Sequence, residues 1–180
     1  MTSARIPSHL RLACRAYLGS HTGAAAAEFA LVLTLLTIPL LNAFDIGVYV
    51  YQRMQLDNAA QVAVQTAWAQ CAPSGDVPAM VNNNCAGLAA AMTAAIKTTP
   101  LGAGVTITST TENYCCPGAG TITCQGPVAT TTPVNCTSGQ PPGDYIFITA
   151  SYTYSPLYSG VSVAGLLTTP IVRTAWMRLS

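Results

Sequence analysis

The chain has 180 residues, of which 7% are charged and 51% are apolar. Ordinary soluble domains carry roughly 25% charged residues, so this composition is typical of a protein with a large apolar segment. The length leaves room for one domain and an anchor. The net charge of +1 gives no electrostatic reason to propose a nucleic acid as a partner.

A basic leader precedes a long apolar run. The leader covers residues 1–23, contains Arg5, Arg11 and Arg15, and has no acidic residue. The stretch Phe29–Phe44 that follows carries no charge, and about 20 apolar residues are enough to cross a bilayer. The sequence therefore predicts one membrane-spanning helix directly after the leader.

The distribution of basic residues predicts the orientation of that helix. Basic residues just before a span stay on the cytoplasmic side of the membrane. Arg53 follows the span and argues for the opposite orientation, but the three arginines of the leader outnumber it. We therefore expect a single-pass protein of the inner membrane. Its N-terminus would be cytoplasmic, and the bulk of the chain would be periplasmic or extracellular.

The predicted helix continues beyond the membrane. No Pro or Gly occurs between Gln52 and Gln70, and apolar residues recur there at steps of three and four. This apolar stripe consists of Leu56, Ala60, Ala63, Ala67 and Trp68. The pattern predicts a single helix over residues 24–70. The Pro-Ser-Gly turn at residues 73–75 would end this helix.

Three further charged residues have simple interpretations. Asp45 is expected at the outer membrane interface, one turn before Tyr49 of an aromatic belt. The alternatives for Asp45 are an ion pair with Arg53 and a contact with a partner subunit. Arg173 and Arg178 are expected at solvated strand ends, with partner binding as the alternative.

A second helix is predicted between about Pro78 and Thr98. Its apolar positions recur at steps of four and three, at Val81, Cys85, Leu88, Met92, Ala95 and Ile96. The run of asparagines at residues 82–84 divides this segment, and Asn84 is a candidate N-cap for its more regular part.

The rest of the chain favours β-structure. Strands are predicted at Val105–Thr108, at Tyr145–Tyr154, where the alternation is clearest, and at Thr169–Leu179. The segment Thr111–Gly143 is rich in Pro, Gly, Thr and Cys, so it is expected to be a loop held by cross-links instead of a core. The predicted fold class is α+β. A long transmembrane helix extends into an exported domain, which has a second helix and a small antiparallel sheet and is stapled by disulfides.

The cysteines support an exported domain. There are seven, and Cys14 lies in the leader. The other six are Cys71, Cys85, Cys115, Cys116, Cys124 and Cys136. An even number in a small exported domain indicates disulfides, and six cysteines allow 15 pairings, among which the sequence does not choose. Cys71 and Cys85 bracket the turn between the two helices and could join them.

No strong catalytic or metal-binding motif is present in the sequence. Zinc is disfavoured because the adjacent Cys115 and Cys116 lack Cys-x-x-Cys spacing and both histidines lie in the leader. No nucleophile-elbow, phosphate-loop or zinc-protease motif is found. A carboxylate pair of Glu112 and Asp144 stays open as a catalytic alternative. We expect a non-catalytic protein without a cofactor or a metal.

A specific motif stands at the head of the apolar run. Gly23 is followed by four alanines and then by Glu28 and Phe29. A carboxylate at the edge of a span is costly unless it is paired or has a function. The motif resembles the processing site of type IV pilin-like proteins. Residues 23–65 resemble the TadE/TadF-like pseudopilins of the tight-adherence (Tad, Flp) pilus system. The resemblance does not distinguish TadE from TadF or from looser TadE-like members.

The resemblance implies a role for each residue of the motif. A prepilin peptidase would cut after Gly23, so that the mature chain begins at Ala24 and keeps the apolar helix. Glu28, with Phe29 beside it, would serve assembly by pairing with the new amino group of Ala24 on a neighbouring subunit. The simpler alternative is an acidic residue that the helix macrodipole favours at a helix N-terminus.

The function that the resemblance implies is that of a minor pilin or pseudopilin needed for assembly of a tight-adherence pilus. Its partners would be the membrane, the prepilin peptidase and other pilin subunits, and it could be incorporated in the pilus. The chain would comprise a cleaved leader (1–23), a TadE-like helix (24–70) and an exported cysteine-rich domain (71–180). The alternative is a disulfide-stabilised surface adhesin or binding domain on an uncleaved signal anchor.

Overall fold

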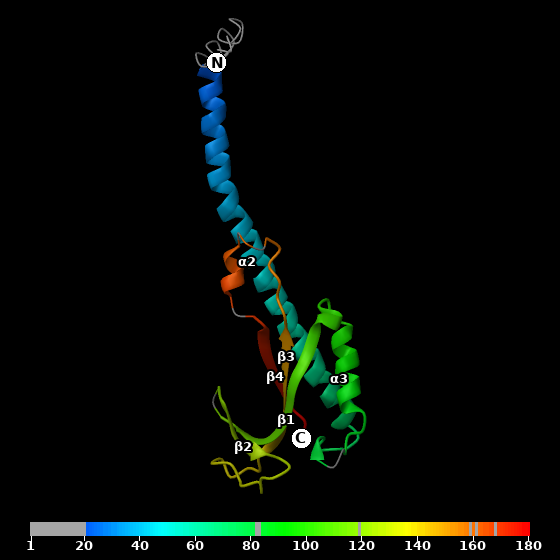
Figure 1. Cartoon of the computed structure of the whole chain (residues 1–180). Helices are drawn as coiled ribbons and strands as arrows, with labels where there is room; N and C mark the ends of the chain where they lie inside the picture. Colours follow the sequence, from blue (N-terminus) through cyan, green and yellow to red (C-terminus); the bar gives the residue numbers. More distant parts are fainter. Residues whose placement is uncertain (1–20, 82–83, 119, 159, 161, 168) are drawn as a thin grey trace, which may run out of the picture.

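A long helix, α2 (His21–Cys71), projects from a small domain made of a second helix, α3 (Leu88–Lys97), and a four-stranded sheet (Figure 1). The computed structural model describes residues 21–81, 84–118, 120–158, 160, 162–167 and 169–180. The leader up to residue 20, with Cys14, therefore lies outside the described residues.

Helix α2 confirms the single long helix predicted over residues 24–70. It has 51 residues and continues through Pro39. Its polar side chains in the apolar part bond to the helix itself, since the hydroxyls of Thr34 and Thr37 donate to the carbonyl oxygens four residues earlier at 2.8 and 2.7 Å. Hydrocarbon offers no partner to polar groups, so these internal bonds suit a helix surrounded by lipid.

Helix α3 is shorter than the helix predicted between Pro78 and Thr98. It begins at Leu88, after Gly87 in the left-handed conformation (φ 77°), and Asn84 is not its N-cap. A left-handed residue interrupts a helix, and glycine adopts that conformation without strain. The side-chain amide of Asn84 instead donates to the carbonyl oxygen of Pro78 at 3.2 Å. Residues 82 and 83 of the asparagine run lie outside the described residues.

Four antiparallel strands form the sheet, in the order β2-β1-β3-β4. They are β1 (Val105–Pro117), β2 (Ile122–Pro127), β3 (Gly143–Tyr152) and β4 (Ile171–Arg178). The three predicted strands are confirmed with shifted ends: residues 105–108 belong to β1, β3 ends at Tyr152 instead of Tyr154, and β4 lies within residues 169–179. Two 3-10 helices, η2 (Gly102–Gly104) and η3 (Val163–Leu166), precede β1 and β4.

The prediction of a loop over residues 111–143 is wrong in part. Residues 111–117 continue β1, and residues 122–127 form the edge strand β2. Most of β2 is exposed, so its sequence lacks the alternation of a strand that covers a core. Backbone pairing with β1 and a disulfide between Cys115 and Cys124 hold it in place, which composition alone does not predict.

The inner face of the sheet packs against the lower half of α2 and against α3. Ile146, Ile148 and Ala150 of β3 are fully buried, as their alternation predicts. The buried face of α2 includes Leu56, Ala59, Ala60, Ala63, Val64, Ala67 and Cys71. Trp68 is half-exposed and does not belong to this face, because it follows Ala67 by one step of about 100° around the helix.

Candidate functional site

The upper part of α2 stands free of the domain. Every residue from Gly23 to Leu40 is exposed, including the large apolar side chains. At 1.5 Å per residue this part is about 27 Å long, close to the ~30 Å hydrocarbon core of a bilayer. Within the described part of the chain, α2 is the single helix long and apolar enough to cross a membrane.

The residues of the predicted processing and assembly site lie at the free end of α2. Gly23 and Ala24 are already helical and exposed, and Glu28 and Phe29 follow about one turn later. This places the carboxylate of Glu28 on a helix surface that the domain does not cover. Cleavage and a role in assembly stay predictions.

Asp45 occupies a different environment from the one predicted. Its position at the outer membrane interface stays a prediction, but its side chain is fully buried against the domain instead of facing the membrane surface. The hydroxyl of Tyr154 donates to Oδ1 of Asp45 at 2.7 Å, and the backbone N–H of Leu157 donates to the same oxygen at 3.0 Å. Two donors from a distant segment therefore satisfy Oδ1 of this buried carboxylate.

The surroundings of Tyr154 stabilise its hydrogen bond to Asp45. Burial, followed by the hydrogen bond and the negative charge of Asp45, raises the pKa of Tyr154 to about 12. The phenol therefore keeps its proton and stays a hydrogen-bond donor at any physiological pH. The ring of Tyr49 packs edge-on against it, with ring centroids 5.2 Å apart. The sequence contained a signal for this contact, because a carboxylate so close to a span needs a partner.

The predicted solvated strand end is confirmed for Arg178, the exposed last residue of β4, and is wrong for Arg173, which is partly buried inside the strand. Nε of Arg173 lies 3.2 Å from Oδ1 of Asp57, so β4 is ion-paired to α2 through half-exposed side chains. Nε of Arg178 donates to the backbone carbonyl of Ser180. Both arginines therefore contact protein groups, although pairs this exposed contribute only about 0–1 kcal/mol.

The structure brings the carboxylates of Glu112 and Asp144 into one buried pair. Glu112 and Asp144 lie on the neighbouring strands β1 and β3 and are 5% and 2% exposed. Glu112 accepts the backbone N–H groups of Ala79 at 2.6 Å and Met80 at 2.8 Å. The pKa of Asp144 is raised to about 8, mainly by burial and secondly by the neighbouring carboxylate of Glu112. This arrangement fastens a turn to the sheet, and its burial does not suit a site for substrate.

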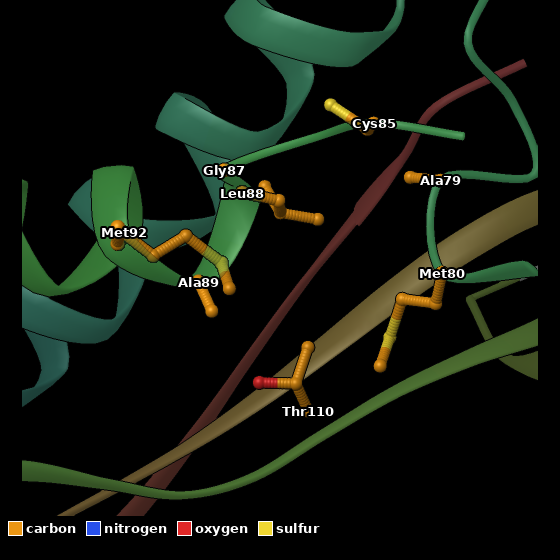
Figure 2. Close-up of a pocket in the computed structure, with 9 residues that line it drawn as sticks. Ala79, Met80, Cys85, Gly87, Leu88, Ala89, Met92 and Thr110 are labelled. Atoms are coloured by element: carbon orange, nitrogen blue, oxygen red, sulfur yellow. The ribbon is translucent and has the colours of Figure 1, made fainter. Parts of the chain in front are cut away.

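A pocket of about 380 Å³ lies between α3, the turn at residues 79–80 and β1 (Figure 2). Its lining is apolar apart from Thr110, and no lining residue is charged. The sulfur of Cys85, which also lines it, is bound in a disulfide. The pocket therefore offers no acid, base or free thiol for catalysis.

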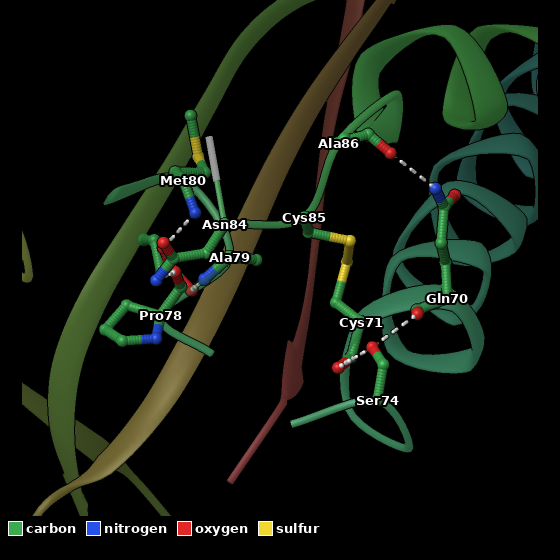
Figure 3. Close-up of a disulfide and its surroundings, with 10 residues drawn as sticks. Gln70, Cys71, Ser74, Pro78, Ala79, Met80, Asn84, Cys85 and Ala86 are labelled. Atoms are coloured by element: carbon green, nitrogen blue, oxygen red, sulfur yellow. Dashed lines mark hydrogen bonds between the residues drawn. A yellow bond between two sulfur atoms is a disulfide. The ribbon is translucent and has the colours of Figure 1, made fainter. Parts of the chain in front are cut away.

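All six cysteines in the described part of the chain are paired. The disulfides are Cys71–Cys85, Cys115–Cys124 and Cys116–Cys136. The first joins the end of α2 to the segment before α3, and Figure 3 shows it beside a hydrogen bond from Nε2 of Gln70 to the carbonyl of Ala86 at 3.0 Å. The other two fasten β2 and the following loop to β1. In the described residues, no cluster of three or more His, Cys, Asp or Glu side chains could hold a metal.

These features separate the chain into an exposed apolar helix and a cross-linked domain that holds the helix from Asn42 downward. Residues 23–65 match the family model of TadE-like protein. The match begins at the glycine of the motif and ends inside the part of α2 that packs on the sheet. It confirms the resemblance predicted from the sequence. No curated protein and no solved structure matches the chain.

The similarity to TadE-like proteins therefore rests on residues 23–65 of α2, about a quarter of the chain. The exposed apolar part of α2 fits a single-pass membrane anchor in such a family. The cysteine-rich part of the domain lies beyond the TadE-like segment, so its arrangement comes from the structure alone.

Proposed function

We propose that this protein is a minor pilin or pseudopilin that takes part in assembly of a tight-adherence pilus without catalysing a reaction. The observation that carries the proposal is the exposed helix surface from Gly23 to Leu40, which has Glu28 near its start and contacts no part of the domain. A helix of this kind can be surrounded by lipid before assembly and by other pilin helices afterwards.

The organisation of the chain follows from this proposal. Residues 1–23 are a leader that a prepilin peptidase removes, residues 24–70 form the helix used for anchoring and stacking, and residues 71–180 complete the exported domain. The leader remains cytoplasmic and the domain lies on the other side of the membrane. Glu28 pairs with the amino group of Ala24 on a neighbouring subunit, which relieves the cost of a carboxylate in an apolar environment.

The first experiment is the N-terminal sequence and intact mass of the protein purified from its native membrane. The proposal expects a chain that begins at Ala24 and lacks six hydrogens because of the three disulfides. A chain that retains the leader would contradict it and leave a signal-anchored surface domain. A chain that begins beyond Tyr51 would contradict the anchor itself.

The second experiment tests Glu28 in assembly. We expect Glu28→Ala to be cleaved normally but to lower the number of pili on the native cells by at least tenfold. Thr34→Ala is the matched control, because Thr34 is exposed on the same helix and its hydroxyl bonds only to Ala30 of that helix. Equal pilus numbers in the two variants would contradict a role for the carboxylate.

An adhesin on an uncleaved anchor is the second candidate function. A cavity of about 590 Å³ lies on the outer face of the sheet, beside the cross-linked β1–β2 hairpin. Phe147 and the half-exposed Trp176 line it, and the ring of Tyr145 packs against that of Trp176. An aromatic cavity of this size can receive a ligand. Retention of the leader, with ligand binding lost in Trp176→Ala, would favour this function.

A further inference from the structure

The segment between β3 and β4 carries an exposed apolar surface. We call residues 156–158, 160 and 162–167 the juxtamembrane loop; it includes the 3-10 helix η3. Its exposed large apolar side chains are Leu157, Tyr158, Val163 and Leu166, and Leu166 is 88% exposed. The sequence from Tyr145 to Val172 contains no charged residue. An exposed group of apolar side chains without charge indicates a surface that water does not cover in the functional state.

Three hydrogen bonds fix the juxtamembrane loop and its approach to α2. The N–H of Val163 donates to Oδ1 of Asn42 at 2.6 Å, and the N–H of Leu157 donates to Oδ1 of Asp45 at 3.0 Å. The hydroxyl of Tyr154, just before the loop, donates to the same carboxylate. Figure 1 shows that this loop and η3, in orange, are the parts of the domain closest to the exposed half of α2.

The length of the exposed helix sets the depth of the loop. Glu28 stands at one edge of the apolar run, and the uncharged residues Phe29–Phe44 span about 24 Å of a hydrocarbon core of about 30 Å. Asn42 and Asp45 then lie at the level of the lipid headgroups. The juxtamembrane loop is bonded to both residues, so it must lie at the same depth, on the side of the membrane that faces the domain.

We propose that the juxtamembrane loop inserts into the headgroup region of the bilayer and gives the domain a second attachment to lipid beside α2. Leu157 and Leu166 contact the upper acyl chains, and Tyr158 suits the interface because its ring is apolar and its hydroxyl polar. Lipid is the occupant because the loop continues a surface that α2 already places in the membrane. The inference rests on the proposal that α2 spans a bilayer.

The same contact explains how a carboxylate is tolerated at this depth. Asp45 is the single charged residue between Glu28 and Arg53, and the domain buries it completely. The loop and Tyr154 therefore cover its charge on the side where lipid would otherwise meet it. Two attachments, a helix and a loop, hold the domain in one orientation relative to the membrane.

Depth-dependent fluorescence quenching tests the insertion. The full chain carries Trp68→Phe and Trp176→Phe, both at half-exposed positions, and one new tryptophan. It is placed in phosphatidylcholine vesicles that carry bromine either high or low on the acyl chains. For Leu166→Trp we expect at least a twofold loss of fluorescence with bromine high on the chains, and emission at shorter wavelength than in water.

Two matched variants control the measurement. Val134→Trp changes an exposed apolar residue in the loop after β2, which Figure 1 shows in yellow at the end of the domain remote from the exposed helix. We expect this tryptophan to be unquenched and to emit as in water. Leu33→Trp lies in the middle of the exposed part of α2, and bromine low on the chains should quench it most. Intact mass confirms that each variant keeps its three disulfides.

Each other outcome overturns the proposal in a distinguishable way. If Leu166→Trp behaves like Val134→Trp while Leu33→Trp is quenched, α2 spans the bilayer and the loop faces water. If Leu166→Trp emits at short wavelength but is unquenched, a protein surface covers the loop instead of lipid. If Leu33→Trp is also unquenched, the membrane anchor fails, and both this proposal and the proposed function fall.

Discussion

The hydroxyl of Tyr154 lies 2.7 Å from Oδ1 of Asp45, although the two residues are 109 positions apart in the chain. This contact joins the segment after β3 to α2, directly below the exposed half of the helix. A carboxylate that composition assigns to the membrane surface therefore serves to attach the domain to its anchor. This contact and the neighbouring bond of Asn42 fasten the domain to α2 in addition to the core that Leu56 and its neighbours form.

Removal of the Tyr154 hydroxyl should loosen this junction. Tyr154→Phe leaves the buried carboxylate of Asp45 with one donor fewer, which typically costs about 1–3 kcal/mol of unfolding free energy. Thermal unfolding in detergent micelles measures the loss. Tyr158→Phe is the matched control, because Tyr158 is exposed and its change should leave the stability within about 0.5 kcal/mol of the parent. Equal stability of the two variants would refute the role of the hydroxyl.

The long helix could be predicted from the sequence because its signals are local. An uncharged run, the absence of Pro and Gly beyond Gln52, and steps of three and four are enough to define α2. The buried positions of β3 follow from alternation in the same way. Local signals of this kind also define the TadE-like motif at Gly23 and Glu28.

The contacts of the charged residues could not be predicted, because they depend on the tertiary fold. Asp45 meets Tyr154 only after the sheet docks on α2, and Glu112 meets Asp144 only through the register of β1 and β3. Gly87 starts α3 through a left-handed conformation that sequence spacing does not encode. Composition likewise misassigned β2, whose stability comes from strand pairing and a disulfide.

The pair of Glu112 and Asp144 predicts a pH dependence of stability. The pKa of Asp144 is about 8 in the folded protein, against an ordinary value of 3.8. The folded state therefore holds a proton that the unfolded chain releases, so the unfolding free energy should fall as the pH rises from about 4 to about 8. Above pH 8 this contribution is lost and the dependence should flatten.

Asp144→Asn isolates this effect. The amide is neutral at every pH, so the variant should lose the decline between pH 4 and pH 8 and should be more stable than the parent at pH 8.5. Denaturant unfolding across this range measures both features. Tyr158→Phe, whose side chain is exposed in the juxtamembrane loop, should keep the decline of the parent. A decline that persists unchanged in Asp144→Asn would show that another group is responsible.

The disulfide Cys71–Cys85 should control the docking of α3. Both cysteines are buried in the core, and the bond closes a separation of 14 residues. A disulfide over a loop of this size stabilises by about 3 kcal/mol in the chain-entropy account. We expect the double variant Cys71→Ala, Cys85→Ala to lose about 2–4 kcal/mol. Hydrogen exchange should show the loss of protection at the amides of α3.

The disulfide Cys116–Cys136 provides the comparison for that experiment. It closes a longer separation of 20 residues, but it fastens the loop after β2 instead of the core. The double variant Cys116→Ser, Cys136→Ser should therefore expose the amides of the loop after β2 to exchange and leave those of α3 protected. If the amides of α3 exchange equally fast in both double variants, the disulfide Cys71–Cys85 does not specifically protect α3.

Two leucines on one helix should respond differently to truncation, because the two halves of α2 have different surroundings. Leu56 is fully buried between the helix and the sheet, so Leu56→Ala should cost about 2–5 kcal/mol of unfolding free energy. Leu36 lies on the exposed half and contacts no part of the domain, so Leu36→Ala should change it by less than about 0.5 kcal/mol. Denaturant unfolding in micelles, followed by the native tryptophans, compares them. A loss in Leu36→Ala as large as that in Leu56→Ala would mean that the upper helix packs on the domain, which would leave no free surface for lipid or for neighbouring pilin helices.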